Sequence, residues 1–259
     1  MLTIEPIPAF NDNYIWLLQN GSQCAVVDPG DATPVLAVLQ QRGLTLTTVL
    51  ITHHHFDHVG GLPALIERYQ PVVYGPENPA IESITCRVVA GAKVDVLGAE
   101  FSVFTVPGHT LDHIAFYHAG DATPAGPTLF CGDTLFAGGC GRMFEGTAPV
   151  MLASLSQLAN LPSATRVYCA HEYTQSNLRF AQIVEPDNSA LDKRIHTVAG
   201  QRERSEPTVP SSIAVERATN PFLRCAEPAL IAALKREGKW QGDAPAAVFA
   251  ALRSWKDSF

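Results

Sequence analysis

The sequence predicts an α/β fold in which helices pack outside mixed β-sheets. Short strand-like apolar runs fill the first two-thirds of the chain, and segments with apolar residues at three- and four-residue spacing interrupt them. That alternation is typical of sheets covered by helices. Beyond about residue 171 the sequence is more charged and its patterns are helical, which predicts two parts, residues 1–170 and a mainly helical part, residues 171–259.

The individual elements are short. Strands are expected at Thr3–Ile7, Tyr14–Leu18, Cys24–Asp28, Thr48–Thr52, Phe101–Val106, Ile114–Tyr117, Thr128–Cys131 and Arg166–Cys169. Helices are expected at Thr33–Arg42, Gly61–Tyr69 and Val150–Leu161, with two more between Glu172 and Arg204 that divide near Pro186, and two in residues 227–259. Three prolines predict a loop at Ser205–Pro221.

The composition excludes several classes of protein. A chain of 259 residues with 46% hydrophobic content can bury a sizeable core. A net charge of −7 argues against a general nucleic-acid binder. Six cysteines without C-x-x-C spacing, no signal peptide and no long apolar run together predict a cytoplasmic protein with no membrane partner, and a monomer is expected.

A cluster of histidines follows the strand expected at Thr48–Thr52. The residues from His53 to His58 have the pattern H-x-H-x-D-H, with the aspartate at Asp57. At a strand end alternate side chains point the same way, so His53 and His55 can converge on one ion, while Asp57 and His58 can face a second point. A solvated histidine-rich loop is the alternative, but the apolar strand before the cluster and the aspartate at fixed offset favour a metal site.

Three further candidate ligands also come directly after expected strands. They are His109 in Pro107–Thr110, Asp133 in Cys131–Thr134, and His171. Active sites on sheets are commonly built at strand ends. We therefore expect these side chains to belong to the same site.

Four segments, T-H-H-H-F-D-H, P-G-H-T, G-D-T-L-F and A-H-E-Y, resemble in order and spacing the metallo-β-lactamase superfamily. More narrowly, the chain resembles the glyoxalase II family of hydroxyacylglutathione hydrolases, because Asn11–Tyr14, Gly139–Arg142 and Arg253–Asp257 match as well. The match covers essentially the whole chain. The resemblance implies a four-layered αββα sandwich, with the catalytic domain in residues 1–170, followed by a C-terminal α-helical substrate-binding domain in residues 171–259.

The resemblance also implies a binuclear metal site with seven ligands. It assigns His53, His55 and His109 to one ion, Asp57, His58 and His171 to the other, and Asp133 as the bridging carboxylate. Imidazoles with two carboxylates suit zinc or iron and do not suit magnesium or calcium. Two divalent ions per chain are expected, with zinc first and iron or manganese as alternatives.

The activity that the resemblance implies is hydrolysis of the thioester S-D-lactoylglutathione, and of other S-2-hydroxyacylglutathiones, to D-lactate and glutathione. This is the second step of methylglyoxal detoxification. Two ions lower the pKa of a shared water to roughly 7, which predicts a bridging hydroxide as the nucleophile. Asp57 is the expected catalytic residue, because it can ligate metal and also hold the proton of the hydroxide.

Glutathione carries two carboxylates, so its binding requires cations and hydrogen-bond donors. Arg142, Arg253 and Lys256 are the expected cations, and Tyr173 matches a family position that contacts substrate. For Arg253 and Lys256 a solvated helix end is the alternative. The family has a lysine and a tyrosine where this chain has Arg142 and Phe144, and loss of the hydroxyl removes a hydrogen bond of about 0.5–1.5 kcal/mol.

Other functions on the same scaffold remain as alternatives. A β-lactamase, a lactonase or an RNA-processing nuclease shares the fold, and a persulfide dioxygenase uses one iron held by two histidines and an aspartate. A purely structural metal module is a further alternative. Asp28, in an Asp-Pro-Gly sequence, is interpreted either as a turn residue or as a support for a ligand histidine.

Overall fold

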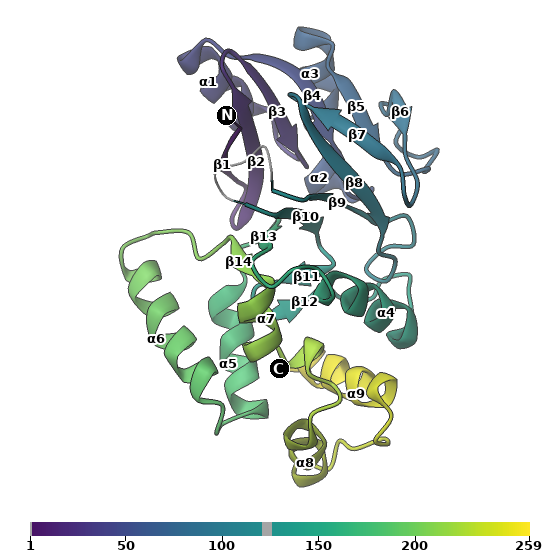
Figure 1. Ribbon diagram of the computed structural model, residues 1–259, viewed down its shortest axis with the longest axis vertical. Helices are drawn as coiled ribbons and strands as arrows, with labels where there is room; N and C mark the ends of the chain where they lie inside the picture. Colours follow the sequence, from purple (N-terminus) through teal and green to yellow (C-terminus); the bar gives the residue numbers. More distant parts are fainter. Residues whose placement is uncertain (1, 121–125) are drawn as a thin grey trace. The chain divides into compact units, whose positions relative to one another are not determined.

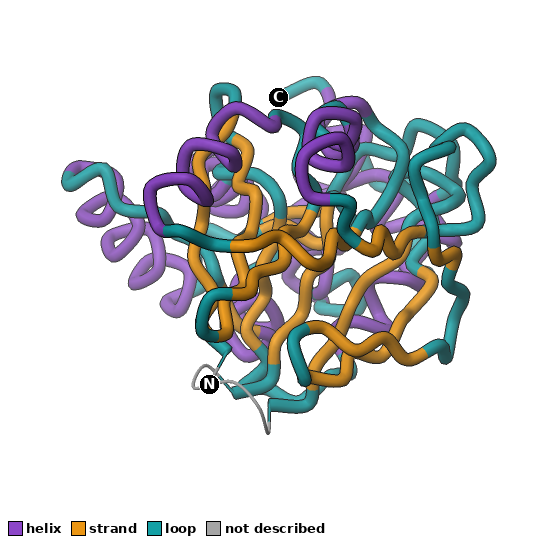
Figure 2. Tube along the Cα trace, turned by 90° about the horizontal axis from the view of Figure 1, so that it is seen from above, coloured by secondary structure: helices purple, strands orange, loops and turns teal. Residues whose placement is uncertain are grey.

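The computed structural model describes residues 2–120 and 126–259, with strands and helices distributed as Figures 1 and 2 show. The chain divides into two compact units. Unit 1 comprises the chain up to Val106 together with Asp112–Gly132 and Tyr168–His171. Unit 2 comprises Pro107–Leu111, Asp133–Val167 and Glu172–Phe259.

One sheet of unit 1 has the strand order β1-β2-β3-β4-β5-β6. The strands are β1 (Thr3–Ala9), β2 (Asn13–Asn20), β3 (Gln23–Val27), β4 (Thr45–Leu50), β5 (Val72–Gly75) and β6 (Cys86–Arg87). The first three pair antiparallel and the pairs from β3 to β6 are parallel. Parallel neighbouring strands need a crossover connection. The helix α1 (Ala32–Arg42) lies in the connection from β3 to β4, and α3 (Leu62–Tyr69) lies in the connection from β4 to β5.

The second sheet of unit 1 contains β10, β9, β8 and β7 in this order, preceded by Tyr168 and Cys169 of β13. The strands are β7 (Lys93–Val96), β8 (Ala99–Thr105), β9 (Ile114–His118), β10 (Thr128–Gly132) and β13 (Arg166–Cys169). All five residues of β10 are buried. A strand that is covered on both faces has mostly apolar residues at consecutive positions. The run Thr128–Cys131 could therefore be predicted as a strand from the sequence.

In the core of unit 1, apolar side chains of the first sheet pack against those of α1 and α3. Ile15, Val26 and Val49 of the sheet pack in one cluster with Leu39 of α1 and Leu65 of α3. The helix α1 begins where Asp31 accepts a hydrogen bond from the amide of Thr33, and it ends at Gly43, whose φ is 64°. Packing of these apolar faces holds the strand ends, and hence the loops that leave them, in place.

Unit 2 is mainly helical. Its helices are α4 (Ala148–Ala159), α5 (Thr174–Val184), α6 (Ser189–Glu203), α7 (Ile213–Thr219), η1 (Pro221–Leu223), α8 (Pro228–Arg236) and α9 (Pro245–Asp257). The short strands β11 (Leu135–Phe136) and β12 (Gly139–Cys140) form a hairpin, and β14 (Ser211–Ser212) pairs with Arg166 and Val167 at the start of β13. The predicted division of one helical stretch near Pro186 is confirmed by α5 and α6.

The prediction of a continuous loop at Ser205–Pro221 was wrong, because this stretch contains β14 and α7. Ser212 caps α7 by accepting a hydrogen bond from the amide of Val215. Glu216, inside the helix, is fully buried among polar partners. A buried glutamate gives no apolar periodicity, so the pattern of the helix was hidden in the sequence.

The expectation of mixed sheets with helices packed on them, and of a helical C-terminal part, is confirmed. Among the described residues, no helix has both the length and the apolar character required to cross a bilayer. Short α2 (Phe56–Val59) lies within the histidine cluster, directly after the loop that leaves β4.

Candidate active site

His53 and His55 lie just beyond the end of β4, in unit 1. The Nε2 atom of His53 is 3.2 Å from the Nδ1 atom of His55. His53 is fully buried and its ring stacks on that of His113 at a centroid distance of 4.5 Å. The intervening His54 points elsewhere, since its Nδ1 atom is 3.0 Å from a carboxylate oxygen of Asp112. The side chains of His53 and His55 therefore point the same way and that of His54 points in another direction, as expected of a strand end.

Asp57, His58 and His171 form a second group of potential ligands within unit 1. Oδ2 of Asp57 is 3.5 Å from Nε2 of His58 and 3.4 Å from Nε2 of His171. Both histidine side chains are almost completely buried. His58 comes from α2, and His171 follows β13, so two distant segments meet at one carboxylate oxygen.

Unit 2 holds one further pair of potential ligands. Nε2 of His109 is 3.4 Å from Oδ2 of Asp133. The other ring nitrogen of His109 donates a hydrogen bond to the carbonyl oxygen of Arg142, at 2.8 Å. The hydrogen bond at Nδ1 leaves the lone pair of Nε2 for a metal.

The distances between these donor atoms test whether the residues suit a metal. Two donors that each lie about 2.0–2.1 Å from one tetrahedral ion are about 3.3 Å apart. The separations of 3.2, 3.4, 3.5 and 3.4 Å match that value. The donor types and their spacing therefore fit divalent metal, and the fold family implies a pair of such ions.

Asp12, in the turn between β1 and β2, and Asn13, the first residue of β2, form hydrogen bonds with two of the potential ligands. Asp12 Oδ1 accepts a hydrogen bond from Nδ1 of His171 at 2.8 Å, and Asn13 Nδ2 donates to Oδ2 of Asp57 at 2.9 Å. A backbone bridge between Asn13 and His171 fixes the two segments against each other. Such partners select the ring tautomer and the orientation of a metal ligand.

Asp28 supports the cluster from the end of β3. Its carboxylate accepts hydrogen bonds from the amide and the hydroxyl of Thr52, each at 2.8 Å, and its Oδ2 atom is 3.1 Å from Nδ1 of His58. Its φ of 53° lies in the left-handed region, which Asp tolerates better than most residues. Asp28 therefore contacts the candidate ligand His58, as the ligand-support interpretation requires, and its φ suits a turn.

Two glycines allow the backbone to approach the candidate ligands. A Cβ atom on Gly30 would lie 1.9 Å from the carbonyl oxygen of Asp57. In unit 2, a Cβ atom on Gly141 would lie 2.0 Å from the carbonyl oxygen of Asp133 and 3.0 Å from Nδ1 of His109. Neither position has room for a side chain, so both close approaches require glycine.

Comparison with known families accounts for the whole chain. The metallo-beta-lactamase superfamily model matches residues 9–171, and the model of the hydroxyacylglutathione hydrolase C-terminus matches residues 172–259. Hydroxyacylglutathione hydrolases of Chromohalobacter salexigens and Pseudomonas aeruginosa PAO1 are 54% and 53% identical, each over the full length of both chains. The chain belongs to the hydroxyacylglutathione hydrolase family.

Solved structures agree with this placement. The chain is similar to ETHE1 from Myxococcus xanthus, with a TM-score of 0.65 and 25% identity over all of this chain and 99% of that one. It is also similar to TTHA1623 in a di-iron-bound form, with a TM-score of 0.59 and 26% identity over 85% of this chain and all of the other. The metallo-β-lactamase fold and the family expected from the sequence are therefore confirmed.

The cations expected to bind the hydroxyacylglutathione hydrolase substrate all belong to unit 2. Arg253 is buried, with its guanidinium donating to the carbonyl oxygen of Cys140 and to Asp257, both at 3.0 Å. The alternative of a solvated helix end is therefore wrong for Arg253. Lys256 is half-buried and donates to the carbonyl oxygen of Ser176 at 3.3 Å, whereas Arg142 is exposed, 3.7 Å from Asp257.

These positive charges influence one another. Burial is the largest cause that lowers the pKa of Lys256 from its ordinary 10.5 to about 8. The charges of Arg253, Arg179 and Arg142 lower the same pKa, and Asp257 opposes them. Four cations therefore gather near one carboxylate, a charge imbalance that favours an anionic ligand.

Two aromatic side chains flank the candidate residues of unit 2. Phe144 is 64% exposed, its amide donates to the carbonyl oxygen of His109, and its ring lies 5.3 Å from that of His109. Tyr173 is partly exposed, and its ring packs edge-on against Phe136. Both rings are accessible for contact with a ligand.

Sequence reasoning assigned no individual role to three residues of the candidate site, Asp12, Asn13 and Arg179. Asp12 and Asn13 were recognised only as part of a family motif, although adjacent polar residues directly before an apolar strand pattern were the available signal. Arg179 was not considered. It stands three positions after Ser176 on α5, so the helical period places it on the same face as the residue that Lys256 contacts.

Proposed function

We propose that this chain hydrolyses S-D-lactoylglutathione, and other S-2-hydroxyacylglutathiones, to D-lactate and glutathione, the second step of methylglyoxal detoxification. The observation that carries the proposal is the convergence of Asp57, His58 and His171 at metal-ligand spacing in a chain of this family. Full-length relatives named hydroxyacylglutathione hydrolase support it.

The proposed metal ligands are the seven residues expected from the sequence. His53, His55 and His109 would hold one ion, Asp57, His58 and His171 would hold the other, and Asp133 would be a ligand shared by both. The donor set of five imidazoles and two carboxylates supports zinc, and also iron, which is found in the similar TTHA1623. We propose zinc as the resident metal, with iron or manganese as substitutes.

Asp57 is the proposed catalytic residue. When bound, two such ions lower the pKa of a shared water to roughly 7 and supply hydroxide at neutral pH. Asp57 Oδ2 is held by the amide of Asn13, so its carboxylate is oriented to accept and hold the proton of the attacking water. The leaving thiol has an ordinary pKa of about 8.5, so it departs as thiolate without a strong general acid.

Substrate binding is assigned to Arg142, Tyr173, Arg253 and Lys256. The carboxylates of glutathione suit the excess of positive charge around Lys256, to which Arg179 contributes. Most of these residues lie in the mainly helical residues 171–259, which we propose as the substrate-binding domain, with catalysis assigned to residues 1–170. The enzyme is proposed to act as a cytoplasmic monomer.

The deciding experiment measures the purified protein with S-D-lactoylglutathione, by following loss of the thioester and determining metal content on the same sample. Hydrolysis with close to two metals per chain is expected. A lactone and glutathione persulfide, with oxygen consumption recorded, serve as parallel substrates. A fully metallated protein that ignores the thioester but consumes one of these would replace the proposal with the lactonase or the persulfide dioxygenase.

A further inference from the structure

Unit 2 contains a surface pocket that the proposed reaction does not use. It has a volume of about 670 Å³ and is lined by α6, α7, β14, the start of β13 and residues just before β13 and β14. Pockets of roughly 300–1,000 Å³ accept small organic ligands. None of the proposed substrate-binding residues Arg142, Tyr173, Arg253 and Lys256 lines it.

The charge of the pocket is opposite to that of the protein. Arg166, Lys193 and Arg194 line it, and no aspartate or glutamate is among its described lining residues. The chain as a whole has a net charge of −7. A local group of cations in an acidic protein attracts an anion rather than polyanionic nucleic acid, whose binding requires an extended basic face.

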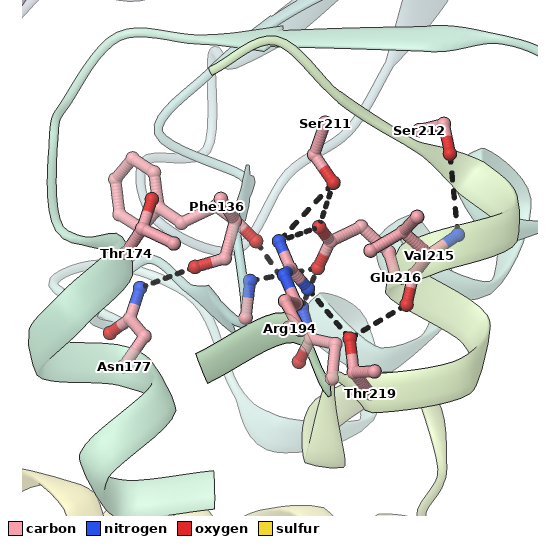
Figure 3. A network of polar contacts seen from close by, with 12 residues as sticks. Phe136, Thr174, Asn177, Arg194, Ser211, Ser212, Val215, Glu216 and Thr219 are labelled. Carbon is pink, nitrogen blue, oxygen red and sulfur yellow. Dashed lines mark hydrogen bonds and ion pairs between the residues drawn. The ribbon is translucent and has the colours of Figure 1, made fainter. Parts of the chain in front are cut away.

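The side chain of Arg194 is bonded to other residues at the pocket wall. Its guanidinium donates to Glu216 and Thr219, each at 2.6 Å, and to Ser211 at 3.2 Å, as Figure 3 shows. Glu216 is fully buried behind it and neutralises its charge. Arg194 therefore shapes the pocket and adds little net charge to it.

Arg166 and Lys193 carry the net positive charge. Both side chains are exposed, and neither forms an ion pair with another of the described residues. Two carboxylates beside the pocket are bonded to other lining residues, Glu216 to Arg194 and Glu172 to the amide of Thr208. The two cations are thus available to a ligand.

The remaining lining residues are either apolar or carry a hydroxyl or amide group, and the apolar ones include alanine and valine side chains of α6 and α7. Ala190 and Val198 contribute from α6, and Ala214, Val215 and Ala218 contribute from α7. Small aliphatic side chains leave a smooth surface against which a compact apolar group can bury its area. A fully polar anion such as inorganic phosphate would leave the alanine and valine side chains without contact.

We propose that this pocket binds a small organic anion, whose acidic group pairs with Arg166 and Lys193 while its apolar body packs against the alanine and valine side chains of α6 and α7. The ligand class is a single carboxylate, sulfonate or phosphate on a compact hydrophobic frame. The site is separate from the proposed hydrolase site, and its binding is measurable without any thioester substrate.

The test uses anilinonaphthalenesulfonate as the anionic probe and its uncharged analogue N-phenylnaphthylamine as the matched control. Each is titrated into the full-length protein, with fluorescence and calorimetry giving affinity and stoichiometry. The expected result is one sulfonate probe per chain, bound at least tenfold more tightly than the neutral analogue. Failure of the sulfonate probe to bind at this stoichiometry would overturn the proposal.

Substitutions in the pocket test whether the sulfonate probe binds there. The double change Arg166→Glu with Lys193→Glu is expected to weaken binding of the sulfonate at least tenfold, and Ala190→Phe, which fills the pocket, should also reduce it. The charge-matched control is Arg68→Glu with Arg87→Glu, two exposed cations of unit 1, and it should leave the affinity within twofold. Equal weakening in the control, or unchanged binding in the pocket variants, would overturn the proposal and leave the proposed hydrolysis untouched.

Discussion

Oδ1 of Asp12 accepts a hydrogen bond from Nδ1 of His171 at 2.8 Å, although 159 positions separate the two residues. The contact leaves Nε2 of His171 directed at Asp57. A carboxylate behind a histidine ligand fixes the tautomer and raises the basicity of the ring. The turn between β1 and β2 is therefore part of the candidate metal site.

Loss of this contact should weaken metal binding. Asp12→Ala is expected to lower the affinity for zinc by roughly 10–100-fold, because outer hydrogen-bond partners of ligand histidines have effects of that size. Competition with a chromophoric chelator measures the affinity independently of activity. Asp187→Ala, a change of an exposed aspartate in the turn before α6, is the control. Equal zinc affinity in the two variants would show that Asp12 has no such role.

The bridging role proposed for Asp133 predicts a larger defect. Asp133→Ala is expected to reduce bound metal to one ion or fewer per chain and to abolish thioester hydrolysis, since one carboxylate serves both ions. Elemental analysis after dialysis, together with turnover, measures both effects. Two retained metals per chain would exclude the bridging assignment.

Close packing at Gly141 predicts that even a methyl group is harmful. Gly141→Ala would place Cβ against the carbonyl oxygen of Asp133, and overpacking of this kind is expected to destabilise the protein by about 1–3 kcal/mol. Gly200→Ala, within α6, should instead stabilise it by up to about 1 kcal/mol, because its Cβ would meet only the end of the Arg204 side chain. Denaturant unfolding compares them, and equal effects would contradict the packing argument.

The lowered pKa of Lys256 predicts a pH-dependent affinity. Below about pH 8 Lys256 is protonated and contributes its charge to the binding of a glutathione carboxylate, and above that pH it becomes neutral. KM should therefore rise as the pH passes through about 8, with kcat little changed. In Lys256→Arg the charge persists and the rise should disappear. A rise of the same size in that variant would assign the titration to another group.

The buried ion pair between Arg194 and Glu216 predicts a strong stability effect. Arg194→Ala leaves Glu216 buried without its cation, and breaking a buried pair in this way costs about 3–5 kcal/mol. The exposed pair between Arg204 and Glu206 is the control, since removal of a surface pair changes stability by about 1 kcal/mol or less. Equilibrium unfolding of Arg194→Ala and Arg204→Ala should separate the two. A loss below about 1 kcal/mol for Arg194→Ala would contradict the prediction.

Much of the fold was predictable because its elements follow local patterns. The alternating run at Phe101–Val106 corresponds to β8, and the helical spacing at Thr33–Arg42 corresponds to α1. The helix α7 was not predictable, because its buried face includes Glu216, which accepts hydrogen bonds from Arg194 and from the amide of Gly138. Polar burial leaves no hydrophobic period in the sequence.

The sequence by itself determined the family and the chemical character of the site, because the H-x-H-x-D-H run places its donors through the geometry of one strand end. Only the tertiary structure decided which residues hold those donors in position. Asp12 meets His171, and Arg179 lies near Lys256, through the pairing of strands and the packing of helices that are distant in the chain. A local pattern specifies which way a side chain points, but the partner that it meets depends on how the elements pack.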